Sequence, residues 1–171
     1  MRSKPWYAVA GLAVAALVVA ALLAARSTST DDADGGDGVA LSFEMLDGTM
    51  GSLADYRGTP LVLNFFASWC VPCLAEMPGF ERVHQDLDGA VAFLGMNLQD
   101  GVEDGRRVVE QTGVTYDIAR DPDGSIFQAF GAVAMPTTVF IDADGRVVDL
   151  HSGEIAAGGL AERIADVLLS S

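Results

Sequence analysis

The chain has 171 residues, with 24 Asp or Glu against 10 Lys or Arg, so its formal net charge is -14. This balance argues against a nucleic-acid binder, because such a protein needs a basic surface that displaces counterions from phosphates. Hydrophobic residues make up 50% of the chain, which excludes disorder throughout, and two cysteines allow at most one intramolecular disulfide.

The N-terminal residues 1–25 combine a positively charged start with a long uncharged run. Arg2 and Lys4 precede residues 5–25, which contain no charged side chain. At a rise of about 1.5 Å per residue, such a run spans a hydrocarbon core of about 30 Å. We therefore expect residues 1–25 to be a transmembrane anchor, with a cytoplasmic N-terminus and everything after Arg26 outside the cell membrane. A cleaved signal peptide, which would make the protein secreted, is the alternative.

A change of composition separates this segment from the rest of the chain. Residues 26–38 are rich in Ser, Thr, Asp and Gly, and they predict a flexible acidic tether. All acidic residues follow residue 30, so the negative charge belongs to the exported part. Residues 39–171 are predicted to form one domain. Its first part, residues 39–57, is compatible with a small N-terminal hairpin that the pattern alone does not place.

Strands and helices alternate along the predicted domain. A nearly continuous apolar run is typical of a strand that is covered on both faces, and apolar residues at three- and four-residue spacing are typical of helices. An Asp-Ala-Asp-Gly segment between the last two strands favours an antiparallel hairpin. The order predicts an α/β domain with a mixed sheet flanked by helices. The predicted elements are a strand over 61–66, a helix over 72–87, a strand over 90–96, a helix over 102–112 that ends at Gly113, a turn over 121–124, a short helix over 125–130, strands over 137–141 and 146–150, and a helix over 155–169.

The chemistry is concentrated in the motif Cys70-Val71-Pro72-Cys73, which lies directly after the apolar strand and opens a helix. In the first turn, unsatisfied backbone N–H groups and the helix dipole stabilise a thiolate. We expect Cys70, at the exposed end, to be the nucleophile. Cys73 lies one turn further along, so we expect it to be more buried and to resolve a mixed disulfide by attacking Cys70.

A metal site is the competing interpretation of the cysteine pair. Structural zinc takes four ligands, and the remaining candidates are His84 and His151. His84 lies about three helical turns from Cys73, which is too far to share one ion. We therefore predict no metal and no cofactor, with a non-enzymatic metal-binding protein or metallochaperone as an alternative. A peroxidase would need Thr or Ser where Ala67 stands.

The chain contains Phe65-Phe66-Ala67-Ser68-Trp69-Cys70-Val71-Pro72-Cys73, Glu76-Met77-Pro78 and Met135-Pro136-Thr137. These three segments resemble a known family, the TlpA/ResA-type thiol–disulfide oxidoreductases, which are anchored in the membrane and act outside the cytoplasm. The resemblance runs from about Leu41 to Leu169. It implies a thioredoxin fold with a short N-terminal β extension, a redox-active disulfide and a cis peptide bond before a downstream proline. It also implies a substrate-binding groove formed by Trp69, Pro72, Met135 and Pro136.

Two polar residues near the motif bear on proton transfer. In typical thioredoxins a buried aspartate occupies the position of Asn64 and helps to move protons, whereas Asn64 cannot titrate. Glu76 is three residues after Cys73 and hence on the same helical face, and the resemblance implies an acid there. A partly desolvated carboxylate could accept the proton of Cys73 as it attacks, so we interpret Glu76 as catalytic. A solvated surface glutamate is the alternative.

The direction of electron flow follows from charge. Val71 and Pro72 add no positive charge, and the chain is acidic, so a thiolate gains little stabilisation and a reductant is favoured. We predict a reductase of disulfides in exported proteins, and the resemblance suggests a role in cytochrome c maturation. A DsbE-like oxidase that forms disulfides in exported proteins is the alternative. Because both cysteines belong to one pair, a membrane thiol-redox partner must renew the electrons.

Overall fold

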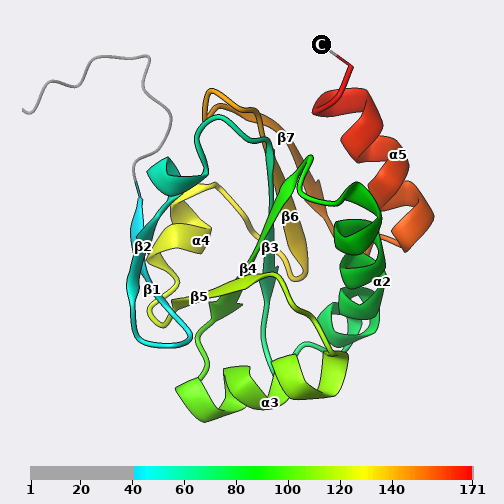
Figure 1. Ribbon diagram of the computed structural model, residues 1–171. Helices are drawn as coiled ribbons and strands as arrows, with labels where there is room; N and C mark the ends of the chain where they lie inside the picture. Colours follow the sequence, from blue (N-terminus) through cyan, green and yellow to red (C-terminus); the bar gives the residue numbers. More distant parts are fainter. Residues whose placement is uncertain (1–40, 171) are drawn as a thin grey trace, which may run out of the picture. The chain divides into compact units, whose positions relative to one another are not determined.

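The computed structural model describes residues 41–170, which form a seven-stranded sheet with helices on both faces (Figure 1). The anchor predicted over 1–25 and the tether predicted over 26–38 lie outside the described residues. Within residues 41–170, no helix is both long enough and apolar enough to cross a membrane.

The sheet combines parallel and antiparallel pairs, as the order of elements predicted. Strand β3 pairs in parallel with β4 and antiparallel with β6, and β4 pairs in parallel with β5. The order across the sheet is β2-β1-β5-β4-β3-β6-β7, so β3 and β4 are flanked on both sides. The strands are β1 (Ser42–Met45), β2 (Met50–Ser52), β3 (Leu61–Phe66), β4 (Ala92–Leu98), β5 (Asp117–Asp121), β6 (Thr137–Ile141) and β7 (Val147–Ser152).

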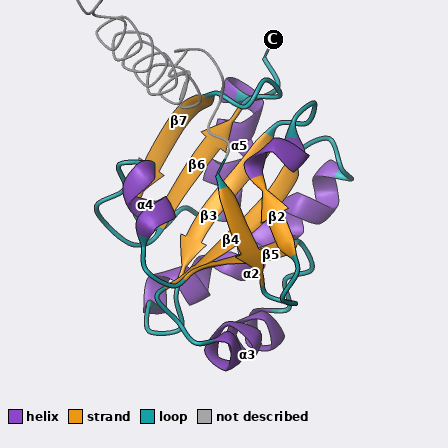
Figure 2. Ribbon diagram, turned by 90° about the vertical axis from the view of Figure 1, so that its left-hand side faces the viewer, coloured by secondary structure: helices purple, strands orange, loops and turns teal. Residues whose placement is uncertain are grey.

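Helices cover the sheet on two sides and divide its core into two layers. In Figure 2, α4 lies in front of the sheet and α5 behind it. Side chains of β3 point alternately into the two core layers. Val62 and Phe66 pack toward α2, α3 and α5. Leu63 and Phe65 pack toward α4 and η1 on the other face. Every residue of β3 is buried, which explains its nearly continuous apolar sequence. The helices are η1 (Leu53–Tyr56), α2 (Val71–Leu87), α3 (Val102–Thr112), α4 (Ser125–Ala129) and α5 (Ala157–Val167).

The segment before β3 does form a hairpin. Strands β1 and β2 pair antiparallel, and β1 also pairs antiparallel with β5. Asp47 accepts hydrogen bonds from the backbone N–H and the hydroxyl of Thr49, at 2.9 and 2.7 Å, and so stabilises the turn between the two strands. This is the N-terminal β extension that the resemblance implied.

One strand was missed, and several element boundaries differ from the prediction by a few residues. Strand β5 was not predicted, because Asp117, Arg120 and Asp121 make its five residues resemble a loop; hydrogen bonding to β4 and β1 creates it. Strand β4 covers Ala92–Leu98 instead of 90–96, since its parallel pairing with β3 begins at Ala92. Helix α5 is shorter than the predicted 155–169, because Ala156 is its N-cap residue with an extended backbone and the helix ends at Val167.

Candidate active site

The two cysteines lie at the edge of the sheet where β3 ends and α2 begins. Cys70 is the N-cap residue of α2, and Cys73 lies in its first turn. They form a disulfide, with their Cα atoms 5.3 Å apart. Pro72 fits this turn because the missing N–H of a proline has no intrahelical partner there anyway. The predicted placement of the pair is confirmed.

Cys73 is the more buried of the two cysteines, as expected, but Cys70 at the helix end is also buried. Cys70 is only 5% exposed, and Cys73 is fully buried. Both belong to the core layer under α2, which also contains Phe66 and Ala67, so packing at the end of β3 covers the N-cap residue. Cys70 nevertheless keeps the only exposure of the pair. A substrate would therefore reach Cys70 first.

Glu76 is buried on the same helix, with an exposed fraction of 3%. Asn64 of β3 donates through Nδ2 to its Oε1 at 2.9 Å, and the backbone N–H of Ile155 donates to its Oε2 at 2.9 Å. Burial raises the pKa of Glu76 to about 7; the hydrogen bonds from Ile155 and Asn64 oppose this rise, and the charge of Glu154 adds to it. The surface-glutamate interpretation is wrong, and this carboxyl can exchange a proton near neutral pH.

An open pocket of about 590 Å³ lies beside the disulfide-bearing turn. Trp69, which is 57% exposed, and the half-buried Met135 both line it. The Met135–Pro136 peptide bond is cis, as the resemblance implied, and Pro136 is buried. Neither the buried Pro136 nor Pro72, which is half-buried, lines this pocket. The other lining residues are Leu98, Gln99, Gly124, Phe127, Gln128, Ala132, Val133 and Ala134.

Residues 37–150 match the model of a protein family described as AhpC/TSA. The chain belongs to the AhpC/TSA family. Among curated relatives, this AhpC/TSA protein is similar to the thiol-disulfide oxidoreductase ResA of Geobacillus thermodenitrificans, with 28% identity over 123 residues and 71% of each chain covered.

Two solved structures share the fold. MTB DsbF is 30% identical, with a TM-score of 0.69 and coverage of 74% of this chain and 93% of that chain. A secreted Mycobacterium tuberculosis disulfide oxidoreductase, homologous to Escherichia coli DsbE, is 25% identical, with a TM-score of 0.68 and coverage of 74% and 96%. The fold is thus thioredoxin-like. Together with the Cys70–Cys73 disulfide, these relatives make the AhpC/TSA protein a thiol–disulfide oxidoreductase.

No sequence pattern distinguishes Asp100 from other surface acids, yet it organises the turn before Cys70. Asp100 follows β4, and its carboxylate accepts from the backbone N–H of Ser68 at 2.6 Å and from the Ser68 hydroxyl at 2.8 Å. It also accepts from Nδ2 of the buried Asn97 at 2.8 Å. One signal could have identified it: parallel strands end at the same edge of a sheet, so polar residues after β4 lie near those after β3.

His84 of α2 packs among aromatic rings, and His151 of β7 lies beside a guanidinium group. The ring of His84 packs against Phe93 and Tyr116, with centroids 5.3 and 5.7 Å apart. His151 of β7 lies 3.4 Å from the Arg163 guanidinium, measured between Nδ1 and Nη1. Across residues 41–170, no group of three or more His, Cys, Asp or Glu side chains is arranged to hold a metal ion.

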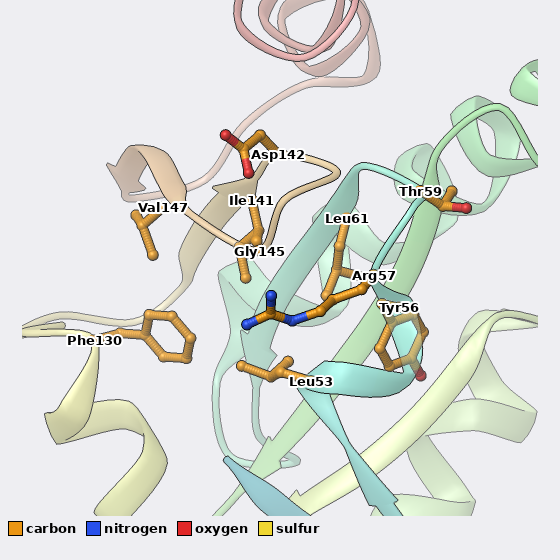
Figure 3. Close-up of a pocket in the computed structure, with 10 residues that line it drawn as sticks. All are labelled: Leu53, Tyr56, Arg57, Thr59, Leu61, Phe130, Ile141, Asp142, Gly145 and Val147. Carbon is orange, nitrogen blue, oxygen red and sulfur yellow. The ribbon is translucent and has the colours of Figure 1, made fainter. Parts of the chain in front are cut away.

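A second pocket lies at the opposite end of β3 and is too small for a substrate. The side chain of Arg57 lies across it, between Leu53 and Gly145 (Figure 3). Its volume is about 10 Å³, and a single water needs at least about 10–15 Å³ by this measure. Leu61, which begins β3, lines it, whereas Cys70 follows the end of that strand. This small pocket therefore lies away from the cysteine pair.

Proposed function

We propose that this protein is a reductase of disulfides in exported proteins, held at the outer face of the cell membrane by residues 1–25. The main support for the direction is the buried carboxyl of Glu76, on the same face of α2 as Cys73. Strong oxidants of this fold stabilise their reduced, thiolate form. A buried acid close to the cysteine pair disfavours a thiolate, and the intervening Val71 and Pro72 carry no charge to compensate.

The reaction begins with the reduced cysteine pair. Cys70 attacks one sulfur of the substrate disulfide, so that a mixed disulfide forms and the first substrate thiolate leaves. Cys73 then attacks Sγ of Cys70, and its proton passes to Glu76 while the second substrate thiolate leaves. The enzyme dithiol is oxidised to the disulfide, and the substrate disulfide is reduced to two thiols. The proton of Cys70 goes to solvent, that of Cys73 follows through Glu76, and solvent protonates the two leaving thiolates.

Substrate binding is assigned to the surface beside the disulfide. An extended segment of the exported protein would lie along Trp69 and Met135 and pair with the backbone near Pro136, while Pro72 borders the disulfide. Trp69 offers a large exposed apolar surface for this contact. After each turnover, a membrane thiol-redox partner would reduce the Cys70–Cys73 disulfide. Family resemblance supports cytochrome c maturation as the process that this reductase serves.

The reduction potential of the Cys70–Cys73 pair tests the direction. Equilibration with thiol buffers of known potential should give a value near that of thioredoxin, about -270 mV. A value near that of DsbA, about -120 mV, would reverse the assignment and favour an oxidase that forms disulfides in exported proteins.

Two variants test the roles of the cysteines. Cys70→Ser should abolish the reduction of an exported disulfide substrate, because the attacking sulfur is gone. Cys73→Ser should accumulate mixed disulfides through Cys70, because nothing resolves them. Unchanged turnover in both variants would refute the proposed function. Elemental analysis of the reduced protein is a separate test, in which a stoichiometric metal would favour a metal-binding role.

A further inference from the structure

Three polar side chains meet in the core layer under α2, and Asn64 lies between the other two. Asn64 is 1% exposed, Glu76 is 3% exposed and Thr138 is fully buried. Asn64 of β3 stands directly opposite Thr138 of β6 in the antiparallel register, so the two side chains share one face of the sheet. Glu76 reaches this pair from α2. The group is therefore enclosed by three elements of the fold.

The hydrogen bonds of this group match an ionised Glu76. The two hydrogens of the Asn64 amide go to Oε1 of Glu76 at 2.9 Å and to Oγ1 of Thr138 at 3.3 Å. The backbone N–H of Ile155 donates a hydrogen bond to the other carboxylate oxygen, Oε2. Both oxygens of Glu76 thus accept, as an ionised carboxylate requires. The Oδ1 atom of Asn64 is buried and has no partner among the described residues, which costs free energy.

A protonated Glu76 needs a different partner. The acid must donate its proton, but the Asn64 amide group that faces it is itself a donor. Half a turn about the Asn64 Cβ–Cγ bond exchanges Oδ1 and Nδ2. The carbonyl oxygen then has two lone pairs, one for the Glu76 hydroxyl and one for the Thr138 hydroxyl, which can donate as well as accept.

We propose that Asn64 is a reversible positioning residue for Glu76: its amide donates to the ionised carboxylate and turns to accept a hydrogen bond from the protonated acid. Asn64 itself never gains or loses a proton. The proposal rests on the proposed function, in which Glu76 takes the proton of Cys73. It adds that both protonation states of Glu76 keep a partner, so the carboxyl stays beside Cys73 throughout the cycle.

Other groups near Glu76 affect its charge and are part of this proposal. Cys73 is one turn away on α2 and is held in the disulfide. Glu154, before α5, repels the ionised form. Tyr116, before β5, interacts with the Glu76 charge, and its buried hydroxyl has no partner within residues 41–170. None of these groups offers Glu76 a hydrogen bond in this structure, whereas Asn64 and Ile155 do.

A pH titration followed by NMR tests the proposal on the full, oxidised chain without substrate. Two signals are recorded together, the carboxyl carbon of Glu76 and the side-chain amide of Asn64, from about pH 9 to about pH 5. As the pH falls, we expect the chemical shifts of the Asn64 amide hydrogens to move away from their hydrogen-bonded values. The midpoint of this change should equal the midpoint of the Glu76 carboxyl titration. The change should reverse when the pH is raised, and it should vanish in Glu76→Gln.

Asn97 is a matched internal control for the titration. Its buried amide also donates to a carboxylate, that of Asp100 at 2.8 Å, and its Oδ1 also lacks a partner among the described residues. The Asn97 signals should not follow the Glu76 midpoint.

Two results would overturn the proposal. The Asn64 amide could keep its hydrogen-bonded shifts while Glu76 becomes protonated, or Glu76 could fail to titrate in this range. Neither result depends on substrate turnover, so failure here is distinguishable from failure of the proposed function, which the reduction potential and the cysteine variants test.

Discussion

The carboxylate of Asp100 binds Ser68 twice, through its backbone N–H at 2.6 Å and through its hydroxyl at 2.8 Å. Ser68 lies two residues before Cys70, in the turn that carries Trp69. The loop after β4 therefore determines the conformation of the turn after β3. This arrangement links the exposed Trp69 and the disulfide to a residue outside the cysteine motif.

Removal of the Asp100 carboxylate should weaken this turn. In Asp100→Ala, Ser68 and the buried Asn97 lose their acceptors, so we expect unfolding to become easier by about 2 kcal/mol. Urea unfolding measures the loss. Asp104→Ala is the control, since its ion pair with Arg107 is largely exposed and should contribute less than about 1 kcal/mol. Equal losses in the two variants would contradict the role of Asp100.

Burial of Glu76 should make stability depend on pH. Folding raises the pKa of Glu76 from 4.5 to about 7, so the folded state holds this proton more tightly than the unfolded state. The resulting stabilisation is present below about pH 4.5 and is lost as the pH rises to about 7, a change of about 3 kcal/mol. Denaturant unfolding across this window should therefore show a shallower pH dependence in Glu76→Gln. An identical dependence in both proteins would show that Glu76 does not titrate this way.

The same substitution should affect exchange kinetics, if Glu76 accepts the proton of Cys73. We expect the resolution of the mixed disulfide to slow about 100-fold in Glu76→Gln and to lose its inflection near the pKa of Glu76. Stopped-flow measurements at several pH values would record this. Glu162→Gln, an exposed change on α5, controls for the loss of one negative charge. A wild-type profile in Glu76→Gln would remove this residue from the proton path.

Phe65 connects the sheet to the short helix α4 beside the pocket that Trp69 lines. It is fully buried, and its ring contacts those of Phe127 and Phe130 at centroid distances of 5.2 and 6.0 Å. Phe65→Ala should cost about 3–5 kcal/mol, because it leaves a cavity in the layer under α4. Thermal and urea unfolding measure the effect. Val148→Ala, at a position 43% exposed, should change stability by less than about 0.5 kcal/mol, and a similar cost at both sites would contradict the assigned packing.

The exposed apolar residues beside the disulfide should contribute to substrate affinity. Val133 is 88% exposed and lines the same pocket as Trp69. Trp69→Ala should raise KM about tenfold, equivalent to about 1.4 kcal/mol of lost binding, with a smaller rise for Val133→Ser. Steady-state reduction of a disulfide-bonded peptide measures both. Val147→Ser removes an exposed valine on β7 and should leave KM unchanged; an equal rise there would show a nonspecific effect.

Much of the fold was predictable from the sequence, because most of its elements have a strong local pattern of apolar residues. The apolar run of β3, the periodic helices α2 and α3, and the final hairpin all appear where the sequence placed them within a few residues. Strand β5 was missed, because its charged residues have no strand-like pattern. It exists because β4 and β1 supply hydrogen bonds on its two sides, and such partners are not visible in a local window of sequence.

The sequence by itself determined the position of the cysteine pair: an apolar strand, a tight turn and a helix start place Cys70 and Cys73 within one turn, where they can form a disulfide. Only the tertiary structure decided the state of Glu76. Its partners Asn64 and Ile155 lie 12 and 79 residues away in the chain, and burial between them raises its pKa. Burial is a property of packed elements, whereas the spacing of the cysteines is local.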